Sequence, residues 1–160
     1  GKSMVADALG RELRAPVLSV DPIEAALWRA GVDRAQPTGY AAYAVADAQA
    51  RSLLALGLDV VIDAVNNIRV AQDGWIAVAR EVRVPLRVVE VVCSDLDLHA
   101  ERLARRDRGL GPELEPDWDR VLERRAESEP WPVDHLTLDS VDDPAANLTR
   151  ALAYVADMAR

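Results

Sequence analysis

Short apolar segments alternate with longer helical segments along this chain, and this alternation constrains the fold more than any other feature. The apolar segments that we predict as strands are 17–20, 59–63, 86–93 and 135–138. The segment 86–93 is rich in valine and apolar enough to be buried on both faces. Because helical segments separate the strands, we expect crossover connections and a parallel sheet covered by helices on both faces, which is an α/β fold.

A helix opens the chain, although a sheet of this kind normally begins with a strand. Val5, Leu9 and Leu13 share one face of this helix, and Ser3 is available as its N-cap. Further helices are predicted at about 22–30, 40–56, 69–84, 95–108, 117–128 and 144–158. The strand that should precede the first helix is expected to be absent or to lie upstream of Gly1. We find no internal repeat or linker, so residues 1–160 are expected to form one domain.

Composition narrows the classes of protein to which the chain can belong. Nineteen basic and 27 acidic residues give a formal net charge of −8, which disfavours long nucleic acids as partners. The apolar runs are too short to span a membrane, so we expect no membrane association. The single cysteine, Cys93, excludes an internal disulfide and suits a reducing cytoplasm. Every basic residue but one is arginine, and the exception is Lys2.

That lysine belongs to the tripeptide Gly1-Lys2-Ser3, which matches the end of the phosphate-binding loop G-x-x-x-x-G-K-[ST]. Glycine lets the backbone approach a phosphate, and the amides at a helix N-terminus favour negative charge. The lysine reaches the terminal phosphates, and the serine hydroxyl binds the Mg²⁺ that bridges them. The alternative is an exposed lysine beside an N-cap serine at a frayed chain terminus.

Two acidic residues fall at the ends of predicted strands. Asp21 follows the segment 17–20, and Asp63 closes the segment 59–63. Ligands of open parallel sheets bind beyond the carboxyl ends of the strands, so both acids are candidates for the functional site. Asp21 is placed where a carboxylate could accept the proton of a substrate hydroxyl. The alternative for each acid is a helix cap or a turn.

Arginines form the third candidate group. Arg102 and Arg106 lie four residues apart and share a helix face, so both could reach one phosphate group. Their helix leads into a loop rich in glycine and proline, as a lid would, and the lid is expected at about 102–117. The alternative is a solvated face with local ion pairs. For Arg124 and Arg125 a solvated helix face is the favoured interpretation.

With these motifs in place, the chain resembles the small P-loop kinases. More narrowly, it is similar to the AAA-domain group of P-loop proteins, which includes zeta-toxin-like, polynucleotide-kinase-like and chloramphenicol-phosphotransferase-like enzymes. The resemblance extends over nearly the whole chain, and its specificity lies in the order and spacing of short motifs. It implies a three-layer α/β/α P-loop NTPase fold. The first strand, which is central in that fold, and the first part of the phosphate-binding loop are expected to be missing from these 160 residues.

The resemblance also implies roles for the opening tripeptide and for Asp63. Gly1, Lys2 and Ser3 would bind ATP, with Lys2 on the β- and γ-phosphates and Ser3 on Mg²⁺. The strand that ends in Asp63 looks like a Walker B strand, so Asp63 would be a partner of the magnesium shell. ATP and Mg²⁺ are therefore the expected cofactors.

The same resemblance implies a reaction, which is transfer of the γ-phosphoryl group of ATP to a hydroxyl of a small-molecule or nucleotide-like substrate. Asp21 would be the general base or would orient the substrate, and Arg102 and Arg106 would stabilise charge on the moving phosphoryl group. The adenine is expected near 139–143, and the acceptor near 28–43. Two alternatives to a kinase stay open: a non-catalytic or regulatory ATP-binding module, and an inactive fragment of a P-loop kinase.

Overall fold

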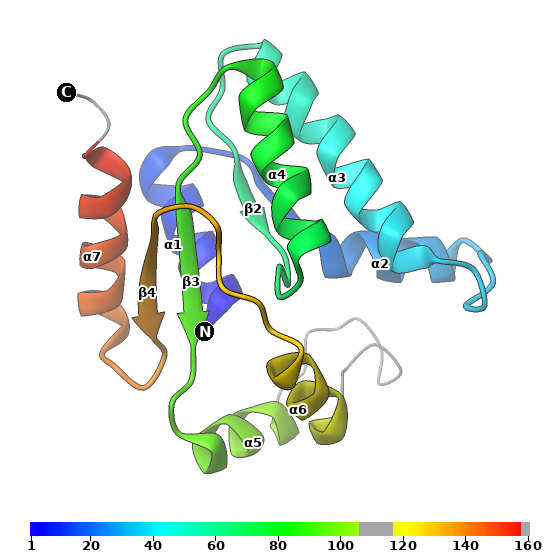
Figure 1. Cartoon of the computed structure of the whole chain (residues 1–160), viewed down its shortest axis with the longest axis vertical. Helices are drawn as coiled ribbons and strands as arrows, with labels where there is room; N and C mark the ends of the chain where they lie inside the picture. Colours follow the sequence, from blue (N-terminus) through cyan, green and yellow to red (C-terminus); the bar gives the residue numbers. More distant parts are fainter. Residues whose placement is uncertain (106–116, 158–160) are drawn as a thin grey trace.

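Helices and strands alternate through the computed structural model, which describes residues 1–105 and 117–157 (Figure 1). The elements are α1 (Lys2–Leu13), β1 (Val17–Ser19), α2 (Val20–Arg29), α3 (Thr38–Ala55), β2 (Val61–Asp63), α4 (Arg69–Val82), β3 (Val88–Val92), α5 (Leu96–Ala104), α6 (Trp118–Ala126), β4 (His135–Asp139) and α7 (Pro144–Ala156). Every predicted strand is present, although most begin or end one or two residues from the expected positions. None of the helices in this part of the chain is long and apolar enough to cross a membrane.

The strands pair in parallel, as the alternation of elements predicts. β1 pairs with β2 from Val17 opposite Val61 to Ser19 opposite Asp63. β3 pairs with β4 along five residues each, from Val88 opposite His135 to Val92 opposite Asp139. Parallel pairing places the carboxyl ends of the two strands together within each pair. In Figure 1, β2, β3 and β4 point the same way, so these ends lie at one edge, which is where ligands of such sheets bind.

Helices cover the strands on both faces, because successive side chains of a strand point to opposite sides. Ile62 of β2 packs against a core cluster that includes residues of α2, α3 and α4, such as Ala46 and Trp75. Val61, its neighbour in the same strand, packs against a second cluster between α1 and α7, which contains Leu9 and Leu138. This arrangement confirms the three-layer α/β/α fold.

The two strand pairs do not join. Between β2 and β3 lies an apolar cavity of about 520 Å³, lined by residues of both strands that include Val61, Ile62, Val89 and Val91. The expectation that 86–93 is buried on both faces is therefore wrong, because only Val88 of β3 is fully buried. The expected strand upstream of Gly1 concerns residues outside this sequence and stays a prediction.

The end of β1 also differs from the sequence-based expectation. We expected the strand to run to residue 20 and Asp21 to follow it, but α2 begins at Val20 and includes Asp21 in its first turn. An acidic side chain is favourable there because the N-terminal end of a helix carries partial positive charge. Pro22 is tolerated beside it, since the first amides of a helix have no partner within the helix.

Candidate functional site

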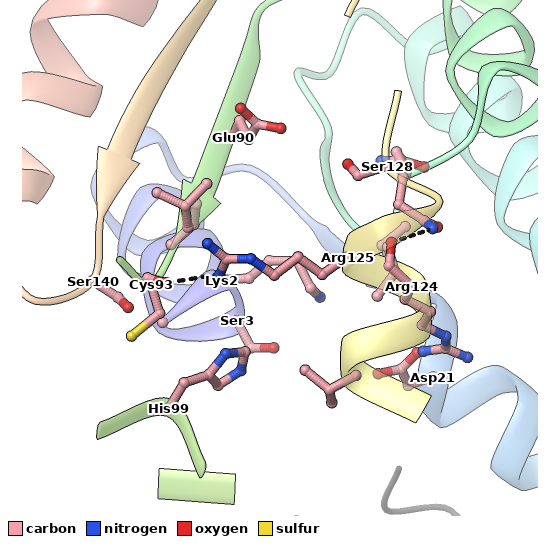
Figure 2. A pocket seen from close by; sticks show the side chains of 18 of the residues that line it. Lys2, Ser3, Asp21, Glu90, Cys93, His99, Arg124, Arg125, Ser128 and Ser140 are labelled. Atoms are coloured by element: carbon pink, nitrogen blue, oxygen red, sulfur yellow. Dashed lines mark hydrogen bonds between the residues drawn. The ribbon is translucent and has the colours of Figure 1, made fainter. Parts of the chain in front are cut away.

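A cavity of about 990 Å³ opens where the strands end and the N-terminus of α1 begins. Figure 2 shows side chains from α1, α2, β3, α5 and α6 around it. Among the predicted site residues, the structure places five on its wall: Gly1, Lys2, Ser3, Asp21 and Arg102. Segments far apart in the sequence thus meet at one site, as their positions at strand and helix ends predict.

Lys2 lines the cavity and pairs with a buried acid behind it, Asp63. The Lys2 ammonium donates a hydrogen bond to Oδ1 of Asp63, and the two groups make an ion pair. Ser19, at the end of β1, donates its hydroxyl to Oδ2 of the same carboxylate at 3.3 Å. The Asp63 side chain is 5% exposed and that of Lys2 is 33% exposed, so the pair connects a buried acid to the open cavity.

Gly1 lies too close to its neighbours for a larger residue. A Cβ atom at this position would fall 2.6 Å from the Cβ of Ser140 and 3.1 Å from a methyl carbon of Val91. Glycine therefore allows the start of α1 to approach the ends of β3 and β4. Ser3, the second residue of α1, lies on the cavity wall next to Lys2.

Asp21 and Arg124 both line the cavity, and the charges of both act on the pKa of a nearby phenol, that of Tyr43. The hydroxyl of Tyr43 donates to the backbone carbonyl of Val65 at 2.6 Å. Burial raises the pKa of Tyr43 to about 12, the charge of Asp21 adds to this rise, and the charge of Arg124 opposes it. Asp21 and Arg124 are thus both within electrostatic reach of one phenol, although they come from α2 and α6.

The α6 arginines form part of the cavity wall. Arg125 is exposed and Arg124 is half-buried, so the solvated helix face that we expected for them also lines the open cavity (Figure 2). Nη1 of Arg125 donates to the carbonyl of Cys93 at 3.1 Å, across the cavity from its own helix. Arg120 also lines the cavity, and its spacing of four from Arg124 is a signal that both lie on one face.

Arg102 connects α5 to the segment after β4. Its Nη1 donates to the carbonyl of Ser140 at 2.9 Å, within the region 139–143 where we expect the adenine. Asp139 is held by hydrogen bonds from Ser94 and from the amide of Val141, which keep the pKa of its carboxyl below the usual value. Arg106 and most of the expected lid at 102–117 lie outside the described residues.

The expected acceptor segment contributes only part of its length to the cavity. Trp28 is on the wall, and its indole donates to the hydroxyl of Thr38 at 2.8 Å, which in turn donates to Glu24 at 2.8 Å. Tyr40 is 76% exposed to solvent and does not line the cavity. Sequence reasoning missed Glu24 and the asparagines Asn66 and Asn67, which also line the cavity.

The donor set suits magnesium better than a transition metal. Within residues 1–105 and 117–157 no group of three or more His, Cys, Asp or Glu side chains could hold a metal ion. Mg²⁺ needs no such group, because it is commonly bound by one or two protein oxygen atoms together with substrate phosphates and water. Ser3 and Asp63 supply oxygen donors of this kind.

Comparisons with known proteins agree with this geometry. A family model described as "AAA domain" matches residues 1–128. A search of curated proteins finds no significant match. Solved structures share the fold over nearly the whole chain. A kinase-like protein from Chloroflexus aurantiacus J-10-fl is 17% identical, with a TM-score of 0.75 over 98% of this chain and 90% of its own.

Two further structures show the same fold. A gluconokinase from Sinorhizobium meliloti 1021 is 18% identical, with a TM-score of 0.70 over 99% of this chain and 86% of its own. A sugar kinase from Janibacter sp. HTCC2649 is 18% identical, with a TM-score of 0.68 over 97% and 87%. The family supports a nucleotide-binding function, and the solved structures show that the fold is that of small P-loop kinases. The chain belongs to the AAA-domain family of P-loop proteins.

Proposed function

We propose that this protein is an ATP-dependent phosphotransferase, which moves the γ-phosphoryl group of ATP to a hydroxyl of a small acceptor. The observation that carries the proposal is the pairing of buried Asp63 with Lys2, which lines a cavity together with Asp21 and arginines from two helices. A cation, a carboxylate near the opening and several guanidinium groups are the components that phosphoryl transfer needs.

Lys2 is the proposed phosphate ligand. Its ammonium is hydrogen-bonded to Asp63 and would turn to the β- and γ-phosphates when ATP binds. Gly1 permits the close approach of backbone at the start of α1, and the helix N-terminus favours the negative charge of the phosphates. Arg102, hydrogen-bonded at the 139–143 segment, would contribute from the nucleotide side.

Ser3 and Asp63 are the proposed magnesium partners. The hydroxyl of Ser3 would bind the ion directly, and Asp63 would accept hydrogen bonds from its water shell once Lys2 turns away. When bound, Mg²⁺ neutralises charge on the β- and γ-phosphates.

Asp21 is the proposed base for the acceptor. The acceptor oxygen would form a new bond to the γ-phosphorus while the bond from that phosphorus to the bridging oxygen breaks, leaving ADP. The hydroxyl proton passes to the Asp21 carboxylate. Arg102, Arg124 and Arg125, together with Arg106, would stabilise the negative charge on the transferred group.

The proposed acceptor is small and bears hydroxyl groups. A cavity of about 990 Å³ accommodates a nucleotide together with a second small molecule. Polar side chains of Glu24, Asn66 and Asn67 on its wall suit hydroxyl groups. Two proteins of the same fold are named as a gluconokinase and a sugar kinase, which favours a polyhydroxylated acceptor here.

The substitution Asp21→Asn tests the proposal and separates it from a non-catalytic nucleotide-binding module. A phosphotransferase should lose transfer by about 100-fold or more and keep its affinity for Mg·ATP, since the general base contributes to the chemical step. Titration calorimetry measures the affinity, and formation of ADP in the presence of pooled hydroxyl compounds measures transfer. Equal transfer by the variant and the unmodified protein would contradict the role of Asp21.

A further inference from the structure

Hydrogen bonds join the segment after α6 to the start of α4, although the two are about 60 residues apart in the chain. We call this contact between Glu129 and the residues 66–72 the junction. The amide of Glu129 donates to the carbonyl of Asn67 at 2.8 Å. In return, Oε2 of Glu129 accepts from the amide of Arg69 at 2.5 Å. Arg69 is the first residue of α4. The side chain of the N-cap residue, Ile68, makes no capping hydrogen bond. Glu129 thus satisfies an amide that the helix itself leaves without a partner.

Gln72 stands at the centre of this junction and is fully buried, with 0% of its surface exposed. Its Nε2 donates to the carbonyl of Asn66 at 3.1 Å and to the carbonyl of Glu129 at 2.9 Å. Both hydrogens of the amide group are therefore used, one on each side of the junction. Its Oε1 is buried without a hydrogen-bond partner among the described residues. Gln72 therefore holds the junction together through the two hydrogen bonds that its amide group donates.

The junction connects directly to the cavity. Asn66 and Asn67, which receive these contacts, line the cavity. Nδ2 of Asn67 donates to the backbone carbonyl of Arg124 at 3.1 Å, so the last turn of α6 is bonded to the loop after β2. The indole of Trp75, one turn along α4 from Gln72, fixes the side chain of Asn66 at 3.0 Å.

α6 depends on such polar contacts because it contains no buried residue. Hydrophobic burial normally holds a helix in place, and this helix has little of it. Near its start, the ring of Trp118 meets the ring of His99 with centroids 5.4 Å apart. At its other end, hydrogen bonds from Asn67 and around Gln72 attach the helix and the segment after it to the loop after β2 and to α4.

We propose that Gln72 is a positioning residue of the nucleotide cavity. By joining the carbonyls of Asn66 and Glu129, it fixes the end of α6 against the loop after β2 and so sets how far Arg124 and Arg125 reach over the cavity. This inference builds on the proposed function, in which those arginines bind phosphate. It goes beyond that function because Gln72 touches neither the cavity nor any ligand in it.

The substitution Gln72→Met tests the proposal, because methionine keeps the volume of the side chain and removes both donors. We expect the Kd for Mg·ATP to rise by about 10-fold, since small displacements of binding groups have large effects. Stability should fall as well, because the carbonyls of Asn66 and Glu129 lose their donor. Val78→Ala is the matched control: Val78 is a buried residue of the same helix that does not line the nucleotide cavity. This control should lower the melting temperature and leave the Kd unchanged.

A double-mutant cycle with Arg125→Ala shows whether Gln72 acts through the arginines. The proposal expects Gln72→Met to change the Kd much less in the Arg125→Ala background than in the unmodified protein. Full additivity would overturn it, as would an unchanged Kd in the single variant. Both readouts are ATP affinities, so loss of phosphoryl transfer alone would count against the proposed function and not against this inference.

Hydrogen exchange of the unmodified protein supplies a test that needs no variant to fold. Addition of Mg·ATP should increase the protection of the α6 amides and of the loop 64–68 together, because the junction couples them. Protection of the loop without any change in α6 would overturn the proposal.

Discussion

Removal of the Lys2 ammonium should destabilise the folded protein as well as weaken ATP binding. The substitution Lys2→Ala leaves the Asp63 carboxylate, which is 5% exposed, with a hydrogen bond from the Ser19 hydroxyl at 3.3 Å and without its cationic partner. Loss of one partner from a fully buried ion pair costs ~3–5 kcal/mol. Because Lys2 is 33% exposed, water can enter the vacated space, and we expect ~2–3 kcal/mol.

Urea denaturation followed by circular dichroism measures this free energy of unfolding, and a double-mutant cycle with Asp63→Asn isolates the pair. Asparagine removes the buried charge, so Lys2→Ala should cost much less in that background. We expect an interaction energy of about 1.5 kcal/mol or more, whereas independent sites add within ~0.5 kcal/mol. An additive result, or no destabilisation by Lys2→Ala, would show a frayed N-terminus and refute the reasoning.

Three further predictions concern the core and the cavities. Because the neutral phenol of Tyr43 is favoured in the folded state, its contribution to stability should persist below pH 10.0 and be lost as the pH rises toward about 12. Phenolate absorbance should show the late ionisation, and Tyr43→Phe should remove it. Leu138→Ala, at a side chain with 0% exposure, should lower the free energy of unfolding by ~2–5 kcal/mol in urea titrations. An apolar strand with a glycine-rich loop, added ahead of Gly1, should raise the melting temperature, because the apolar cavity between β2 and β3 has space of about 520 Å³.

The sequence was sufficient to predict the order of elements and the parallel pairing, because both depend on local patterns. Apolar runs such as 59–63 and 86–93 alternate with helical segments, and handedness and crossover rules then leave few arrangements. The ends of elements were less predictable. Val20 and Asp21 suit a strand end and a first helical turn equally, and the structure places them in α2.

The positions of Lys2, Asp21 and Arg102 on one cavity were predictable because each lies at an end of a strand or helix. The orientation of α6 was not. Arg124 and Arg125 belong to a highly charged helix without a buried face, so periodicity does not say which side meets the rest of the protein. Hydrogen bonds from residues about 60 positions away decide it, and no local pattern encodes them.

The incomplete burial of β3 has a similar cause. A run of valines predicts a strand with both faces covered, but what covers each edge depends on the neighbouring strand. In the structure β3 pairs with β4 on one side and borders a cavity on the other.

Phosphorus NMR of the protein with Mg·ATP and pooled small hydroxyl compounds tests the central claim most directly. The proposed phosphotransferase should convert ATP to ADP and produce a new phosphomonoester resonance in at least one pool, and Asp21→Asn should abolish this resonance. Binding of ATP without any new phosphomonoester, in pools that cover sugars, sugar acids, nucleosides and other small alcohols, would contradict phosphoryl transfer and identify a nucleotide-binding module.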